Sequence, residues 1–257
     1  MSTHPQRVIL VTGANRGIGF AIIQALASQT ETADSTFLLG CRDSKIGKEA
    51  IEQLDRLEIK AAIQEVVIDV TSDKSIFAAL DTIQNQYGRL DVLINNAGYA
   101  AIPSSSDTSS WREIYAQVFD TNITSVAMVT QAFLPLLRDS PFGRGKVIQI
   151  SSARGSITRS SEGLLPPTVS IPYVLSKTAL NMLTVEMSRD EKNRDVEFAV
   201  VSPGHCRTAF NGFRGTRDPL EGANVVVELV RSEKGKYKNA GFWETQGSDL
   251  ALVEVLW

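Results

Sequence analysis

The strongest constraint on the fold is a repeated alternation of short apolar runs with helical patterns. Six runs rich in β-branched residues are expected to be strands, at residues 8–11, 37–39, 66–68, 92–94, 147–150 and 198–201. Short, continuous apolar runs are typical of strands that are buried on both faces of a parallel sheet. The pattern therefore predicts an α/β fold, a Rossmann-type doubly wound parallel sheet with helices on both faces.

Apolar residues at helical spacing mark three helices between these runs. The apolar positions are Ile18, Ile22, Ala25 and Leu26 in the first helix, Ala50, Ile51, Leu54 and Leu57 in the second, and Ile76, Leu80 and Ile83 in the third. The second pattern starts near Lys48, and the third ends near Gly88, a residue suited to a helix C-cap. The stretches 104–110 and 155–172 are expected to be loops. Because no repeat or linker divides the chain, residues 1–257 are predicted to form a single domain.

Composition excludes several classes of protein. Lys and Arg number 26 against 29 Asp and Glu, and this balance argues against a dedicated nucleic-acid-binding protein. No apolar run reaches the roughly 18 residues of a membrane span, and the N-terminus lacks the apolar core of a signal peptide. Two cysteines without ligand spacing and two histidines argue against a metal centre. We expect a soluble protein of a reducing compartment, the cytoplasm, with no nucleic-acid, membrane or metal partner.

A glycine-rich segment follows the first strand directly and runs into the first helix. It reads Thr-Gly-Ala-Asn-Arg-Gly-Ile-Gly over residues 12–19. Glycines allow a tight turn and close approach of a phosphate to backbone N–H groups, and the helix N-terminus attracts the anion. The spacing is a variant of the common dinucleotide fingerprint, and a tight turn without a ligand is the alternative.

The second strand ends in Gly-Cys-Arg-Asp at residues 40–43. A carboxylate near this point usually grips the ribose 2′-hydroxyl of NAD, whereas an Arg suits the 2′-phosphate of NADP. Arg42 and Arg16 therefore favour NADPH, because guanidinium–phosphate hydrogen bonds are strong and selective. Asp43 is the competing signal, and either Arg also fits a solvated surface charge.

Tyr173 and Lys177 stand four residues apart, on one face of an expected helix. A nearby ammonium is expected to lower the pKa of the phenol, which makes Tyr173 a proton donor to a carbonyl oxygen or an acceptor from an alcohol. Such a pair alone is more often a surface pair. Here Ser151 and Ser152 end the fifth strand, at the carboxyl edge where open α/β sheets bind ligands.

Together these motifs resemble the short-chain dehydrogenase/reductase family, from Arg7 to about Trp243. The resemblance is carried by an ordered series: Thr12 to Gly19, Asp69-Val70, Asn95-Asn96-Ala97-Gly98, Asn122, Ser152 to Gly155, Tyr173 to Lys177, and Pro203-Gly204. The carbonyl-reductase-like members are the most similar, and these are typically soluble and NADPH-dependent. Family members are often dimers or tetramers, so the resemblance implies a homodimer or homotetramer, whereas monomers exist where insertions block the helix contacts.

The resemblance also implies a role for individual residues. The catalytic set would be Tyr173 as general acid, Lys177 as the residue that tunes it, Ser152 as the hydrogen-bond donor to the substrate, and Asn122 as part of a proton relay. Ser152 is preferred to Ser151 because Gly155 then falls at the family's usual spacing. The cofactor would be held by Gly13, Asn15, Arg16, Gly17, Ile18, Gly19, Arg42, Asp69, Val70, Asn96, Ala97, Gly98, Tyr173, Lys177, Pro203, Gly204 and Thr208.

Two segments depart from the common pattern and bear on the substrate. The residues 156–172 lengthen the interval between Ser152 and Tyr173, and form either one wall of the pocket or an inert surface loop. The region of about 205–223 is expected to be the substrate loop. Its Phe210 and Phe213 fit either a mobile lid that offers an aromatic surface or anchors that tie the loop to the core.

The resulting functional hypothesis is NADPH-dependent reduction of a small ketone or aldehyde to an alcohol. Two alternatives remain open at this point. One is an NAD-linked alcohol dehydrogenase, and the other is a non-catalytic nucleotide-sensing protein on the same fold.

Overall fold

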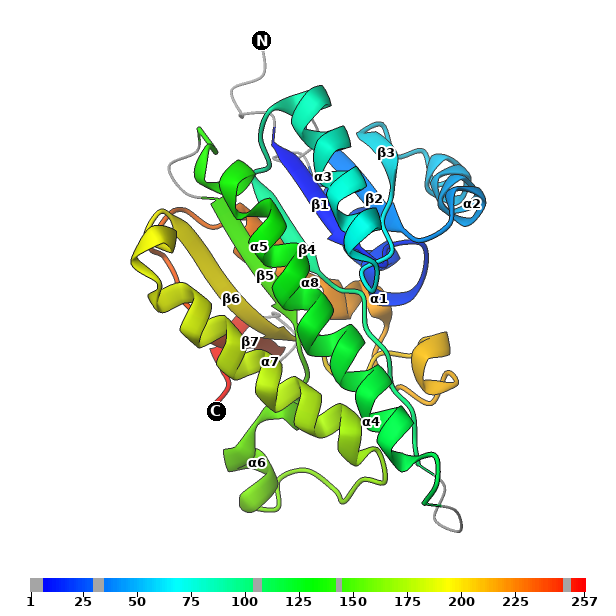
Figure 1. Ribbon diagram of the computed structural model, residues 1–257, viewed down its shortest axis with the longest axis vertical. Helices are drawn as coiled ribbons and strands as arrows, with labels where there is room; N and C mark the ends of the chain where they lie inside the picture. The colour runs from blue at the N-terminus through cyan, green and yellow to red at the C-terminus, as the bar shows by residue number, and fades with distance from the viewer. Residues whose placement is uncertain (1–6, 30–34, 104–107, 142–144, 247–250) are drawn as a thin grey trace.

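A computed structural model describes residues 7–29, 35–103, 108–141, 145–246 and 251–257. One eight-stranded sheet runs through these residues in the order β3-β2-β1-β4-β5-β6-β7-β8 (Figure 1). The strands are β1 (Val8–Thr12), β2 (Thr36–Cys41), β3 (Ala62–Val67), β4 (Val92–Asn95), β5 (Gly145–Ile150), β6 (Val196–Ser202), β7 (Gly241–Gln246) and β8 (Ala251–Glu254). All neighbours pair in parallel except β7 and β8. The predicted Rossmann-type sheet is thus confirmed.

Helices cover both faces of this sheet. One face carries α1 (Gly17–Ala27), α2 (Ser44–Asp55) and α8 (Pro219–Arg231), and the other carries α3 (Asp73–Tyr87), α5 (Ser125–Arg138) and α7 (Ile171–Arg189). In Figure 1, α3, α5 and α7 lie in front of the strands. The helix α4 (Trp111–Phe119) continues into α5 through a π-helical turn, η2 (Asp120–Thr124). A short helix, α6 (Ile157–Ser161), stands outside the two layers (Figure 1).

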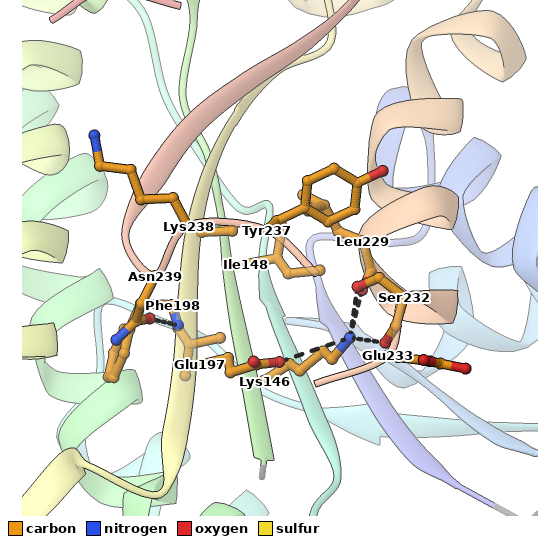
Figure 2. A pocket seen from close by; sticks show the side chains of 12 residues that line it. Lys146, Ile148, Glu197, Phe198, Leu229, Ser232, Glu233, Tyr237, Lys238 and Asn239 are labelled. Carbon is orange, nitrogen blue, oxygen red and sulfur yellow. Dashed lines mark hydrogen bonds and ion pairs between the residues drawn. The ribbon is translucent and has the colours of Figure 1, made fainter. Parts of the chain in front are cut away.

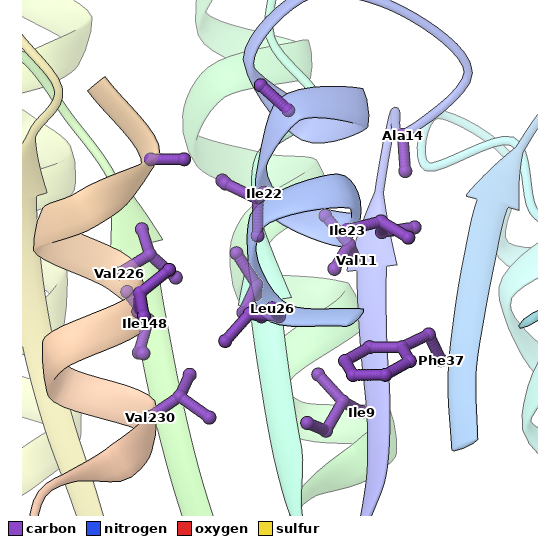
Figure 3. Close-up of a cluster of buried hydrophobic side chains, with 14 of the residues drawn as sticks. Ile9, Val11, Ala14, Ile22, Ile23, Leu26, Phe37, Ile148, Val226 and Val230 are labelled. Carbon is purple, nitrogen blue, oxygen red and sulfur yellow. The ribbon is translucent and has the colours of Figure 1, made fainter. Parts of the chain in front are cut away.

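Alternate side chains of each central strand enter two separate cores. Ile9 and Val11 of β1 pack with Ile22 and Leu26 of α1, and Val226 of α8 joins the same cluster (Figure 3). The intervening Val8 and Leu10 belong to the cluster beneath α3, α5 and α7. Both faces of the strand are buried, which is why the predicted strands are continuous apolar runs rather than alternating ones.

The structure corrects the predicted elements at the edges of the fold. β3 is an edge strand whose Ala62, Gln64 and Val67 are exposed, so the expectation that it is buried on both faces was wrong. The helix α2 begins at Ser44 rather than near Lys48, because the Asp43 carboxylate accepts a hydrogen bond from Ile46 N at 3.0 Å.

Further corrections concern helix ends and the C-terminal part of the chain. Leu57 lies beyond the end of α2 and is exposed, whereas Gly88 caps α3 with a φ of 66° as predicted. The expected loop 155–172 contains α6 and the first residues of α7. Of the expected loop 104–110, residues 104–107 lie outside the described residues. The strands β7 and β8 were not predicted.

Candidate active site

The glycine-rich segment joins β1 to α1 through backbone that other residues adopt only with strain. Gly13 and Gly17 have φ values of +62° and +60°. A Cβ on Gly13 would lie 2.9 Å from Ala97 Cα, and one on Gly19 would lie 2.4 Å from Asn96 Nδ2. The segment therefore packs tightly on the Asn96–Gly98 turn, as a phosphate-binding turn of this fold requires.

Thr12 and Asn96 fasten these two turns together. The Asn96 side-chain amide donates to Thr12 O at 2.9 Å and to Gly13 O at 3.0 Å. The Thr12 hydroxyl accepts hydrogen bonds from Asn96 N and Ala97 N at 3.0 and 3.1 Å. The Asn96 side chain thus braces the glycine turn from within the protein.

The adenosine end of the expected cofactor cleft carries two exposed guanidinium groups. Arg16 and Arg42 are both exposed, and Arg42 directly follows β2. One carboxylate oxygen of Asp43 accepts the hydrogen bond that caps α2, as described above. The Asp69 carboxylate accepts hydrogen bonds from the backbone and hydroxyl of Thr71 at 3.0 and 2.8 Å. The Asp43 and Asp69 carboxylates thus both accept hydrogen bonds from residues two or three positions later in the chain.

Tyr173, Lys177 and Ser152 come together at the carboxyl edge of the sheet. Tyr173 lies in the first turn of α7, and its side chain lies beside that of Ser152, the residue that follows Ser151 at the end of β5. Lys177 is buried, and its Nζ donates to Ile150 O at 2.7 Å. The same nitrogen lies 5.6 Å from the centroid of the Tyr173 ring. This arrangement joins a phenol, a hydroxyl and an ammonium in one site.

Burial sets the proton affinities of this group. It raises the pKa of Tyr173 to about 12, and the hydrogen bond with Ser152 opposes that rise. Burial also lowers the pKa of Lys177 to about 8. The expectation that the ammonium depresses the pKa of the phenol was therefore wrong for this structure, since desolvation is the larger effect. Tyr173 holds its proton at neutral pH.

The two serines at the end of β5 have different surroundings. Ser151 is buried, and its hydroxyl donates to Asn181 Oδ1 at 2.6 Å. Ser152 is partly exposed, and its hydroxyl accepts from Arg154 N at 3.2 Å besides contacting Tyr173. Ser152 is thus the serine that remains accessible beside the phenol.

Asn122 lies in the π-helical turn η2, where it is completely buried. Its side chain forms hydrogen bonds of 2.8 Å with both the N–H and the carbonyl oxygen of Tyr99, and donates to Ser176 Oγ at 2.9 Å. A Cβ on Gly98 would lie 3.4 Å from Asn122 Oδ1 and 4.0 Å from Lys177 Nζ. The side chain therefore fixes the backbone beside Lys177 and leaves only its main-chain groups for a proton relay.

Tyr99 and Ser176 were not singled out from the sequence. Tyr99 directly follows the Asn95–Gly98 motif, and Ser176 precedes Lys177. That adjacency was the only signal in the sequence, because the partner that joins them, Asn122, is distant in the chain.

The loop after β6 returns to the glycine turn. Thr208 is buried, and its Cγ2 lies 3.6 Å from where a Cβ on Gly17 would stand. Gly204 has a φ of +80° and faces the Arg217 side chain, whose guanidinium donates to Pro203 O at 3.4 Å. Thr208, predicted to border the nicotinamide and its phosphates, is therefore close to the glycine turn that is predicted to hold the phosphates.

The remaining predicted cofactor residues lie between these groups. Asn15 and Ile18 are partly buried in and after the glycine turn, and Val70 is partly buried against the core beneath α3.

The substrate loop carries both predicted phenylalanines on its surface. Phe210 and Phe213 are 51% and 65% exposed, so the alternative that they anchor the loop to the core was wrong. The Phe210 ring lies 5.6 Å from the Tyr173 ring, with 58° between their planes.

A hollow lies at the edge of the sheet opposite to Tyr173 and Ser152, at the starts of β5 and β6 (Figure 2). Lys146 Nζ points into it and donates to Leu229 O and Ser232 O at 2.6 and 2.7 Å. Burial lowers the pKa of Lys146 to about 8. These carbonyls belong to the C-terminal end of α8, so the ammonium serves as a helix cap rather than as a catalytic group.

The described residues hold no cluster of three or more potential metal ligands. Within the same part of the chain, no helix combines the length and apolarity that crossing a bilayer requires.

Comparison with known proteins identifies the family. The family model for short chain dehydrogenase matches residues 7–218. The chain is a short-chain dehydrogenase/reductase. A short-chain dehydrogenase/reductase of Aspergillus fumigatus is 36% identical, with 98% of both chains covered. A short-chain dehydrogenase of Penicillium roqueforti is 33% identical over the full length of both chains.

Solved structures agree with this assignment. An NADPH-bound carbonyl reductase from chicken fatty liver superposes with a TM-score of 0.77 and 26% identity, covering 93% of this chain and 96% of that one. A Pseudomonas aeruginosa protein in complex with NADP superposes with a TM-score of 0.78 at 24% identity, covering 94% of each chain, and bears on the fold alone. The chain thus belongs to a family of oxidoreductases that use nicotinamide cofactors.

Proposed function

We propose that the protein reduces a ketone or aldehyde to an alcohol with NADPH, and that Tyr173 donates the proton. The observation that carries this proposal is the placing of Tyr173 beside Ser152, with the buried Lys177 ammonium 5.6 Å from the centroid of the Tyr173 ring. Ser152 and Tyr173 would hold the substrate oxygen between two hydroxyl groups. NADPH, when bound, supplies the hydride.

The proton affinities suit the proposed donation of a proton by Tyr173. With a pKa of about 12, Tyr173 is protonated at neutral pH and ready to donate. Lys177, with a pKa of about 8, is mostly charged at neutral pH and stabilises the phenolate that forms as the proton leaves. Oxidation of an alcohol would instead require that phenolate beforehand.

The cofactor assignment rests on the glycine turn and on Arg42. The close approach of Gly13 to the Ala97 backbone and of Gly19 to the Asn96 side chain leaves no space for side chains where a pyrophosphate would meet the N-terminus of α1. Arg42 and Arg16 are exposed and suit a 2′-phosphate, while Asp43 is engaged in capping α2. The NADPH complex of the chicken carbonyl reductase gives further support.

We also infer that the protein acts in the cytoplasm, since Cys41 and Cys206 are both free, buried thiols. Assembly into a homodimer or homotetramer stays a prediction. A gel-filtration mass would test it.

The test is turnover of a panel of ketones and aldehydes, measured by the loss of NADPH or NADH absorbance. We expect a higher kcat/KM with NADPH, and we expect Arg42→Ala to raise the KM for NADPH about 10- to 100-fold while leaving NADH use unchanged. Arg56→Ala is the control, because Arg56 is an exposed residue just beyond the end of α2. Binding of NADPH without consumption would favour the sensor, and better use of NADH would favour the NAD-linked dehydrogenase.

A further inference from the structure

The substrate loop is closed at its base. Arg207 N donates to Arg217 O at 2.9 Å, and Thr216 N donates to His205 O at 3.0 Å. Gly215 lets the two sides meet, because a Cβ there would lie 2.2 Å from the carbonyl carbon of Cys206. Residues 208–215 therefore form a turn whose two ends are joined by backbone hydrogen bonds.

At the tip of this turn, one residue adopts a strained backbone conformation. Asn211 Nδ2 donates to Cys206 O at 2.8 Å, and Phe213 N donates to Thr208 O at 2.8 Å. Phe213 has a φ of +60°, a conformation that Gly adopts far more readily. Its ring is 65% exposed and gains little from burial. A strained backbone that displays an apolar ring points to a use for that ring.

Phe210 stands beside the proposed proton donor. Its ring is 5.6 Å from the Tyr173 ring, while 51% of the residue remains exposed. A carbonyl oxygen must come within about 3 Å of the Tyr173 hydroxyl to receive its proton. Groups attached to that carbonyl carbon then lie next to the exposed side of Phe210.

We propose that Phe210 and Phe213 form an aromatic shelf that selects flat, conjugated carbonyl compounds over saturated ones. This inference rests on the proposed carbonyl reduction at Tyr173. Aromatic rings attract one another in offset or edge-to-face arrangements beyond the gain from burial alone, whereas a puckered saturated ring offers only burial. The shelf thus discriminates between substrates of equal size.

The test compares 1-tetralone, an aryl ketone, with 1-decalone, its saturated counterpart, in NADPH-dependent kcat/KM. Phe210→Leu keeps an apolar side chain and should lower the kcat/KM for 1-tetralone about three- to tenfold, with 1-decalone unchanged. Phe213→Gly suits the φ of +60°, so it removes the ring while preserving the turn, and a smaller loss of the same kind is expected. Phe77→Leu, a change at an exposed ring on α3, is the control and should alter neither ketone.

The outcomes separate this inference from the proposed function. The aromatic shelf would be overturned if a variant lost kcat/KM equally for both ketones or for neither. It would also be overturned if the wild-type protein reduced 1-decalone but not 1-tetralone. Each of these results would leave carbonyl reduction standing. No NADPH consumption with any carbonyl compound would overturn the proposed function, and the shelf with it. NADPH affinity and the thermal midpoint are measured for each variant, so that a loss of folding is recognised.

Discussion

The part of the molecule from β1 to β4, which contains the glycine turn, and the part from β5 to β8, which contains Tyr173 and the predicted substrate loop, are held together in different ways. We call them the cofactor half and the substrate half. In the cofactor half, the side chains of Thr12 and Asn96 bind backbone groups of the glycine turn and of the Asn96–Gly98 turn, and the glycines allow the two turns to meet. These contacts follow directly from a motif that can be read in the sequence.

In the substrate half, the decisive contacts are made by side chains that belong to no motif of the sequence. Arg159 of α6 donates to both carboxylate oxygens of Glu244 in β7, at 2.9 and 2.6 Å. Ser156 donates to Leu256 O at 2.6 Å, and Thr158 N donates to Trp257 O at 2.9 Å. The segment between Ser152 and Tyr173 is therefore anchored to the last residues of the chain.

This difference suggests a division of tasks. Every dinucleotide presents the same pyrophosphate, so a backbone cradle suffices and leaves little room for variation. Substrates differ, and a segment anchored by side chains can change its residues without disturbing the cradle. The four predictions below test whether the two halves respond separately.

The largest expected effect belongs to Tyr173→Phe. The variant keeps the ring beside Phe210 but has no transferable proton, so kcat should fall roughly 100-fold or more. Steady-state kinetics measure the loss, and a titration with NADPH should give an unchanged Kd. Turnover near that of the wild type would refute Tyr173 as the acid.

Gly13→Ala should damage the cofactor half selectively. The new Cβ meets Ala97 Cα at 2.9 Å, and the residue must also keep a φ of +62°, so the free energy of unfolding should fall by about 2–4 kcal/mol. Urea denaturation measures this change, and NADPH binding should be lost with it. Gly163→Ala is the matched control, because Gly163 has a φ of +70° with nothing within 4 Å, and should cost about 1 kcal/mol. Equal costs would show that the close packing is unimportant.

Lys177 should leave a signature in the pH dependence of stability. Its pKa is lowered from 10.5 to about 8, so between these values the unfolded chain binds a proton that the folded protein does not. The free energy of unfolding should therefore rise with pH, by about 2 kcal/mol from pH 8 to pH 10 for this group. Urea midpoints at the two pH values measure the rise.

The Lys177→Met variant should lose that part of the rise. The pKa of Lys146 is also lowered to about 8, so Lys146 contributes its own part of the rise in the free energy of unfolding. That part should remain in Lys177→Met, and the part due to Lys177 should remain in Lys146→Met. Above pH 10 the raised pKa of Tyr173 acts in the opposite direction, because the unfolded phenol ionises first. An unaltered pH dependence in Lys177→Met would contradict the lowered pKa.

The smallest expected effect is that of Glu244→Gln on the substrate half. Losing the carboxylate loosens α6 from β7, and the kcat/KM for the carbonyl compound should fall about two- to fivefold, since the pair is only partly buried. The KM for NADPH should not change. Glu254→Gln breaks the exposed pair with Lys238 at the same edge of the sheet and serves as the control. A change in NADPH affinity would show that the halves are coupled.

The sequence by itself determined the parallel sheet, the glycine turn and the candidate residues Ser152, Tyr173 and Lys177. Strands buried on both faces must be continuous apolar runs, and a turn with positive φ needs glycine, so both leave a local mark in the sequence. The same reasoning found the cap at Gly88, because capping depends on neighbouring residues.

Only the tertiary structure decided which way the pKa of Tyr173 shifts, how the 156–172 segment is anchored and where Phe210 lies. Desolvation depends on everything that surrounds a group, and here it outweighs the opposing effect of Ser152 on the pKa of Tyr173. The Arg159–Glu244 pair joins residues with no local pattern in common, and β8 pairs only with the neighbour that the fold provides. Interactions between distant segments leave no periodicity to read, so these features became visible only once the chain was folded.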